Sequence, residues 1–239
     1  MTRGSHIERV KLPLRQAPAL APGQAHFWQT RLANLPVMEA QVPTSRSDRL
    51  RQLRMGQKFV LRLLLGAYLG IPGRDVAIVR SAAGKPQLGP GSPDPELQFN
   101  LSHAGELMAV AITRAVPVGI DIELGNRPVR WQKLSRRWFS AAESDWLQSL
   151  EASMARHEFL RAWTLREAMI KAMGSSIGAS IAAIVPEPGQ PASLHSLPQG
   201  WPDAGDWTLH EIAGDATQGW LAAPARIETV RGFELLLGR

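Results

Sequence analysis

Two long stretches with the periodicity of an amphipathic helix, one in each half of the chain, constrain the fold most. Over residues 48–69, apolar side chains recur at spacings of three and four, and Gly70 and Pro72 end the pattern. A second helical pattern runs over residues 153–173 and stops at Gly174. Short strand patterns flank both stretches, so each half is predicted as helices packed on a short, mostly antiparallel sheet.

The strand patterns divide the chain near residue 116. The predicted short elements are a helix over 26–35, strands over 76–81, 97–104, 107–113, 118–124, 207–212 and 220–227, and a loop over 186–206. The sequence therefore predicts an α+β fold with an N-terminal half over residues 1–115 and a C-terminal half over residues 116–239.

Composition limits the class of partner but does not choose one. The chain has 239 residues and no cysteine, which excludes disulfides and thiolate zinc sites. No apolar run approaches the roughly 20 residues of a membrane span, and the first residues lack a signal-peptide pattern. We therefore expect a cytoplasmic protein without a membrane partner. The net charge of +6 favours anionic partners such as nucleic acid, phosphorylated small molecules or an acidic protein.

Residues 118–124, VGIDIEL, place two acids in a strand that otherwise reads as buried. Asp121 and Glu123 point to one face of the strand, and like charges there repel unless a cation lies between them. A third acid, Glu167, lies on the second predicted helix, one turn before Lys171. Hard carboxylate oxygens suit Mg²⁺, which is completed by water and substrate phosphates. The three acids are therefore candidate magnesium ligands.

Structural interpretations of the same residues stay open at this point. Glu167 and Lys171 could form a solvated helix salt bridge worth a few tenths of a kcal/mol. Of Asp121 and Glu123, one could lie at a strand end and the other could pair with an arginine.

Several residues could donate to phosphate. Lys85 lies in a tight turn within GKP, and Ser102 and His103 lie at the end of a strand within NLSH. Residues 46–62 carry six basic side chains against one acid, which fits either a solvated helix face or a dock for phosphate or an acidic protein.

Five motifs occur together in order. They are GKP (84–86), FNLSH (99–103), VGIDIE (118–123), WFSAAE (138–143) and WTLREAMIKAMG (163–174). In order and approximate spacing the set resembles the Sfp-type 4′-phosphopantetheinyl transferases, over about residues 48–180. The resemblance implies a pseudo-twofold pair of similar α+β halves with coenzyme A in the cleft, and a monomer.

The resemblance also implies a reaction. These enzymes move the phosphopantetheine arm of coenzyme A onto a serine of an apo acyl or peptidyl carrier protein and release adenosine 3′,5′-bisphosphate. By resemblance, Asp121, Glu123 and Glu167 would hold Mg²⁺, or Mn²⁺, on the pyrophosphate. Lys171 would neutralise phosphate charge, and Glu167, directly or through water, would take the serine proton.

By the same resemblance, Lys85, Ser102 and His103 would bind the phosphates of coenzyme A. Either Arg51 or Arg54 would supply a phosphate-binding arginine, because the basic helix does not align cleanly with the family's D-x-x-R pattern.

The chain departs from the family pattern at two further positions. Arg166 stands where the family has lysine in W-x-x-K-E, so a site role for Arg166 transfers loosely. Ser176 replaces the second glycine of G-x-G after the helix, which could change the mouth facing the carrier protein.

Two other functions compete with transfer. A magnesium-dependent nuclease would also gather acids and a lysine, but it typically has the lysine two residues after the glutamate on a strand, where this chain has Gly125. A non-catalytic basic binding protein would leave the acids purely structural. We expect the transferase, with coenzyme A and an acidic carrier protein as partners and no nucleic acid.

Overall fold

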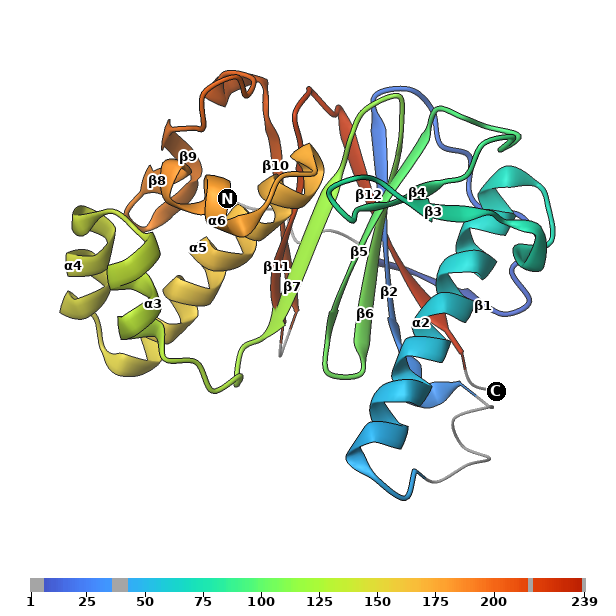
Figure 1. Cartoon of the computed structure of the whole chain (residues 1–239), viewed down its shortest axis with the longest axis horizontal. Helices are drawn as coiled ribbons and strands as arrows, with labels where there is room; N and C mark the ends of the chain where they lie inside the picture. Colours follow the sequence, from blue (N-terminus) through green and yellow to red (C-terminus); the bar gives the residue numbers. More distant parts are fainter. Residues whose placement is uncertain (1–6, 36–42, 215–216, 238–239) are drawn as a thin grey trace.

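The computed structural model describes residues 7–35, 43–214 and 217–237, and its strands form two main sheets (Figure 1). The first sheet contains β1 (Ile7–Lys11), β12 (Thr229–Leu236), β2 (Gln24–Arg31), β6 (Leu107–Arg114) and β5 (Leu97–Ala104), in that spatial order. The second sheet contains β10 (Thr208–Gly214), β11 (Thr217–Ala223) and β7 (Gly119–Leu124), in that order. The last strand, β12, pairs in parallel with both β1 and β2, whereas the other pairs in these sheets are antiparallel.

Each sheet carries one long helix, as the periodicity predicts (Figure 1). Helix α2 (Arg46–Leu69) packs on the first sheet and α5 (Ala152–Met173) packs on the second. The remaining elements are α3 (Trp131–Trp138), α4 (Ala141–Ser149), α6 (Ile177–Ser180), the hairpins β3 (Ile78–Arg80) with β4 (Pro86–Leu88) and β8 (Val185–Glu187) with β9 (Gln190–Ser196), and the 3-10 turns Leu32–Asn34, Gly73–Asp75, Ile181–Ala183 and Ala204–Asp206. The predicted α+β class with two halves is confirmed. Of the helices in the part of the chain that the structure describes, none is both long and apolar enough to cross a membrane.

The two sheets share a hydrophobic core. Phe27 and Ala111 of the first sheet pack with Ile120, Ile122 and Leu221 of the second. Helix α5 approaches β7 so closely that a Cβ on Gly119 would lie 1.9 Å from the Ala168 carbonyl oxygen, so only glycine fits there. These contacts fix β7 between α5 and the first sheet.

Local signals placed both long helices correctly. Ser45 caps α2 by accepting a hydrogen bond from the Asp48 amide, and Gly70 ends it in the left-handed conformation. Gly174 ends α5 in the same way.

Two short predictions are wrong. Residues 26–35 were predicted as a helix, yet β2 occupies most of this range, because pairing with β12 and β6 buries Phe27 and Trp28 on opposite faces. The loop predicted over 186–206 contains most of the β8–β9 hairpin.

The division between residues 115 and 116 stays a prediction. Strand β12 comes from the end of the chain, yet it lies inside the first sheet.

Candidate functional site

Asp121 lies at the meeting point of three elements. Its carboxylate is buried on β7, where Oδ1 accepts hydrogen bonds from Lys171 Nζ of α5 at 2.6 Å and from Ser102 Oγ of β5 at 2.7 Å. The fold therefore brings Asp121 into contact with Lys171, which lies 50 positions later in the sequence, and with Ser102, which lies 19 positions earlier. The contact between Lys171 and Asp121 is a short, charge-assisted hydrogen bond.

The second strand acid, Glu123, has a cation of its own. Arg127, four residues later in the turn after β7, forms an ion pair with the Glu123 carboxylate. The repulsion predicted between Asp121 and Glu123 is thus removed by two side chains, Lys171 and Arg127, so the alternative in which one acid pairs with an arginine holds for Glu123.

Glu167 faces the same region from α5. Burial raises the pKa of Glu167, and the nearby Asp121 carboxylate raises it further, while Lys171 and Arg127 and a hydrogen bond from Trp163 act against this rise. Lys171 pairs with Asp121, so the alternative of a solvated salt bridge between Lys171 and Glu167 does not hold. Of the three acids, Glu167 is the one without an ion-paired lysine or arginine among the described residues.

The three acids fit a divalent cation in chemistry but do not form a finished site. Within the described ranges, no three carboxylate, imidazole or thiolate groups are arranged to hold a metal ion. All three donors are hard oxygens, and Asp121 and Glu167 lie close enough to repel each other, which a divalent cation would relieve. For Asp121 and Glu123 to bind one, they would exchange the cations of Lys171 and Arg127 for it.

A cleft of about 630 Å³ opens beside Glu123, between α2 and the ends of β5 and β7. Its lining residues are Leu50, Leu53, Arg54, Gln57, His103, Ala104, Gly105, Glu123, Leu124, Asn126, Arg127 and Pro128. Burial lowers the pKa of His103, and the positive charges of Lys171 and Arg54 lower it further, against the opposing effect of Asp121. Arg51 and Arg54 are both exposed, but Arg54 lies in the lining and Arg51 does not, so the structure separates two arginines that the sequence left equivalent.

Lys85 lies at the other end of β7. From the β3–β4 turn, Nζ donates to the carbonyl oxygens of Val118 at 3.1 Å and Ala172 at 3.0 Å. Burial lowers the pKa of Lys85 to about 8. Lys85 and Ser102 are not among the residues that line the cleft, whereas His103 is.

Arg166 is buried away from the site. Its guanidinium, with no exposed surface, donates to Glu143 Oε1 at 2.6 Å and to the Ile184 carbonyl oxygen at 2.9 Å, and it lies 3.9 Å from the Phe139 ring centre. Glu143 also completes the capping box with Ser140 at the start of α4. Arg166 therefore contributes to packing and hydrogen bonding inside the fold, whereas the next residue, Glu167, lies near Asp121 of β7.

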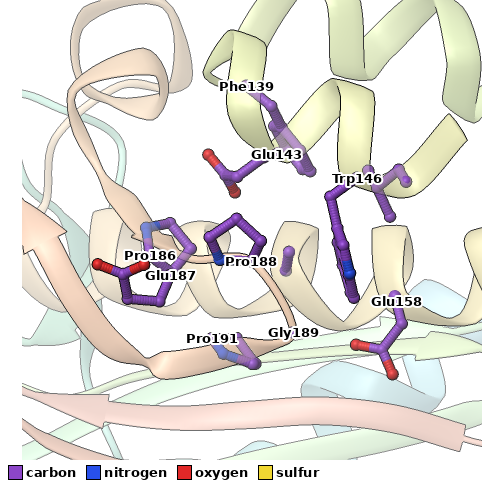
Figure 2. A pocket seen from close by; sticks show the side chains of 11 residues that line it. Phe139, Glu143, Trp146, Glu158, Pro186, Glu187, Pro188, Gly189 and Pro191 are labelled. Carbon is purple, nitrogen blue, oxygen red and sulfur yellow. The ribbon is translucent and has the colours of Figure 1, made fainter. Parts of the chain in front are cut away.

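Figure 2 shows the surroundings of Glu143, with Trp146 beside the β8–β9 turn that carries Pro188 and Gly189. The pocket there is about 10 Å³, which is room for roughly one water molecule. It is not a substrate site.

Arg127 was missed at the level of sequence. The available signal was its spacing, since it lies four residues after Glu123 in a turn next to a strand acid.

Comparison with known proteins identifies similar sequences along most of the chain. Residues 117–216 match a family described as the 4′-phosphopantetheinyl transferase superfamily, and residues 26–115 match one described as 4′-phosphopantetheinyl transferase, N-terminal. The 4′-phosphopantetheinyl transferase HetI of Nostoc sp. is 28% identical over 222 residues, which cover 87% of this chain and 91% of that protein.

Two other relatives match over about half of this chain. The 4′-phosphopantetheinyl transferase gsp of Aneurinibacillus migulanus is 31% identical over 121 residues, 50% of this chain and 47% of that protein. The human L-aminoadipate-semialdehyde dehydrogenase-phosphopantetheinyl transferase is 32% identical over 132 residues, 52% of this chain and 43% of that protein. This chain thus spans less than half the length of these two relatives.

Proposed function

We propose, from the premise that this chain belongs to the 4′-phosphopantetheinyl transferase superfamily and is a transferase, that it modifies an apo acyl or peptidyl carrier protein. In this proposal it transfers the phosphopantetheine arm of coenzyme A to a serine of the carrier and releases adenosine 3′,5′-bisphosphate. The observation that carries the proposal is the convergence of Asp121, Glu167 and Lys171 from two elements next to a basic cleft.

Charge neutralisation is the main demand of this chemistry. A serine oxygen attacks a phosphorus that already bears negative oxygens, so cations must be in place before attack. Lys171 supplies one such charge. Asp121, Glu123 and Glu167 would hold Mg²⁺ or Mn²⁺, which supplies further positive charge to the diphosphate when bound.

Glu167 is the best placed proton acceptor in the proposed site. Asp121 and Glu123 are engaged by cationic side chains, whereas the Glu167 carboxylate accepts a hydrogen bond from Trp163 and has no ion-paired lysine or arginine among the described residues. We assign it the serine proton, directly or through one water.

The phosphates of coenzyme A would lie along the basic side of the cleft. Arg54 and His103 line it, so we assign them to phosphate contacts and leave Arg51 outside the site. Lys85, at the far end of β7, remains a candidate phosphate contact. To bind phosphate, its ammonium group would give up its hydrogen bonds to two carbonyl oxygens. The basic surface of α2 would attract an acidic carrier protein. We further propose that the protein is a monomer and acts in the cytoplasm.

The direct test is transfer to apo carrier proteins. The purified chain is incubated with coenzyme A, Mg²⁺ and a panel of acyl and peptidyl carriers, and intact-mass analysis follows each carrier. We expect a gain of one phosphopantetheine, lost when EDTA is added and when the acceptor serine of the carrier is replaced by alanine. If no carrier in the panel gains mass, the proposed function is wrong.

A further inference from the structure

Among the described residues, no strand forms backbone pairs with one of the two edges of β7. Strand β7 pairs with β11 on one side and ends the second sheet on the other, where it faces β5, the last strand of the first sheet. Backbone groups of alternate residues point to the same edge of a strand, and an open edge must find other partners when it is buried.

Three side chains from two elements, β5 and α5, supply those partners. The Ile120 amide donates to Asn100 Oδ1 at 3.0 Å, and the Ile122 amide donates to Ser102 Oγ at 3.4 Å. The Ile120 carbonyl oxygen accepts from Lys171 Nζ at 3.3 Å. Asn100 and Ser102 are two residues apart on β5, and the Ile120 and Ile122 amides are two residues apart on β7. Because side chains and amides both repeat every two residues along a strand, each side chain meets one amide.

The Ser102 hydroxyl has no capacity left for a phosphate. Its proton is donated to Asp121 Oδ1 at 2.7 Å, while its oxygen faces Lys171 Nζ at 3.4 Å and the Ile122 amide at 3.4 Å. A serine hydroxyl has one proton and two lone pairs. Donating to a phosphate oxygen would therefore take the hydrogen bond away from Asp121.

We propose that Asn100 and Ser102 are positioning residues that hold β7 against β5 and so fix Asp121 beside Lys171. In this assignment Ser102 is not a ligand of coenzyme A, in contrast to the expectation from resemblance. The inference rests on the proposed function for its kinetic consequence only, because the hydrogen bonds to β7 are independent of the reaction.

The kinetic test separates positioning from substrate binding. Ser102→Ala and Asn100→Leu should lower kcat by about 10- to 100-fold through misplacement of Asp121, with KM for coenzyme A within about twofold of the wild type. Ser102→Thr keeps the hydroxyl and should recover most of kcat. A raised KM with unchanged kcat in Ser102→Ala would overturn the assignment and restore Ser102 as a phosphate ligand.

Thr30→Val is the matched control. Thr30 is a buried residue on β2 whose hydroxyl donates to the Leu235 carbonyl oxygen at 2.7 Å, so the variant also loses one side chain to backbone hydrogen bond in the first sheet. It should leave kcat unchanged. A fall equal to that of Ser102→Ala would mean general loosening and would also overturn the proposal.

Amide hydrogen exchange tests the same inference without catalysis. Asn100→Leu should accelerate exchange of the Ile120 amide at least about tenfold, and Ser102→Ala should do so for Ile122, because each loses its acceptor. The Asp121 amide points toward β11 and serves as the internal reference. Unchanged exchange in both variants would refute the positioning role. If the wild type modifies no carrier but these amides respond as expected, the proposed function fails and the positioning role stands; if Asn100→Leu does not fold, Ser102→Ala decides.

Discussion

Arg166→Lys tests whether the residue before the helix glutamate acts structurally. Lysine is the residue that the family pattern has here, so resemblance alone predicts a harmless change. The structure predicts otherwise, because the guanidinium uses three nitrogens on three acceptors: Glu143 Oε1, the Ile184 carbonyl oxygen and the Ala162 carbonyl oxygen. The single ammonium group of lysine cannot donate in the three directions that the planar guanidinium group uses here.

The size of the loss follows from the contacts. We let lysine keep the ion pair with Glu143 and lose the hydrogen bond to Ile184, a charged-donor bond worth about 1.5–3 kcal/mol. The stacking of Arg166 over Phe139 contributes up to about 2 kcal/mol in a desolvated setting. We therefore expect the free energy of unfolding to fall by about 1.5–5 kcal/mol.

Urea denaturation followed by circular dichroism measures this change. The matched control is Arg137→Lys, because the exposed Arg137 guanidinium lies 4.8 Å from the Trp138 ring centre and should cost less than about 0.5 kcal/mol. Turnover per folded molecule should stay near the wild type, since Arg166 points away from the cleft. Equal stability of Arg166→Lys and the wild type would refute the structural role, and a large loss of turnover in a stable variant would make Arg166 part of the site.

Three further predictions concern the site. Asp121→Asn should lower kcat on the order of 100-fold or more and leave a cooperative fold, and near-normal turnover would remove Asp121 from the site. Arg54→Ala should raise KM for coenzyme A about tenfold through the loss of a charge-assisted contact, whereas the control Arg51→Ala should not; equal effects would return both arginines to a solvated face. The pKa of Lys85 is lowered to about 8 in the folded chain, so above that pH the unfolded chain binds more protons and Lys85 contributes stability that increases with pH until its ordinary pKa of 10.5. The unfolding free energy of the wild type minus that of Lys85→Met should therefore increase between pH 8 and pH 10. We expect urea denaturation to show this increase, and a constant difference would contradict the burial of this lysine.

The elements that could be predicted from the sequence, α2, α5 and β7, are those whose ends or periodicity depend on residues close together in the chain. Gly70 and Gly174, which end α2 and α5, are local signals, and the shared face of Asp121 and Glu123 on β7 follows from strand alternation. The strand β2 was predicted as a helix because its identity depends on β12, which lies some 200 residues away and was itself not predicted. Pairing over such a separation leaves no local periodicity to detect.

The site divides in the same way. The proximity of Asp121, Glu167 and Lys171 could be predicted because their residue types and spacing point to one chemistry, and their role in that chemistry stays a prediction. Which cation neutralises Asp121, and which arginine enters the cleft, depends on how α2 and α5 lie against the sheets. The occupied hydroxyl of Ser102 could not be predicted either, because its three partners come from two distant segments, β7 and α5.

The place of β12 between β1 and β2 has a consequence for synthesis and for dissection of the protein. The first sheet lacks an interior strand until residues 229–236 have been made, so the amino-terminal half cannot complete its sheet before then. Cutting the gene at residue 115 would give one fragment with a gap in its sheet and another with an orphaned β-strand, and we expect the two to form a stable product only when they are mixed.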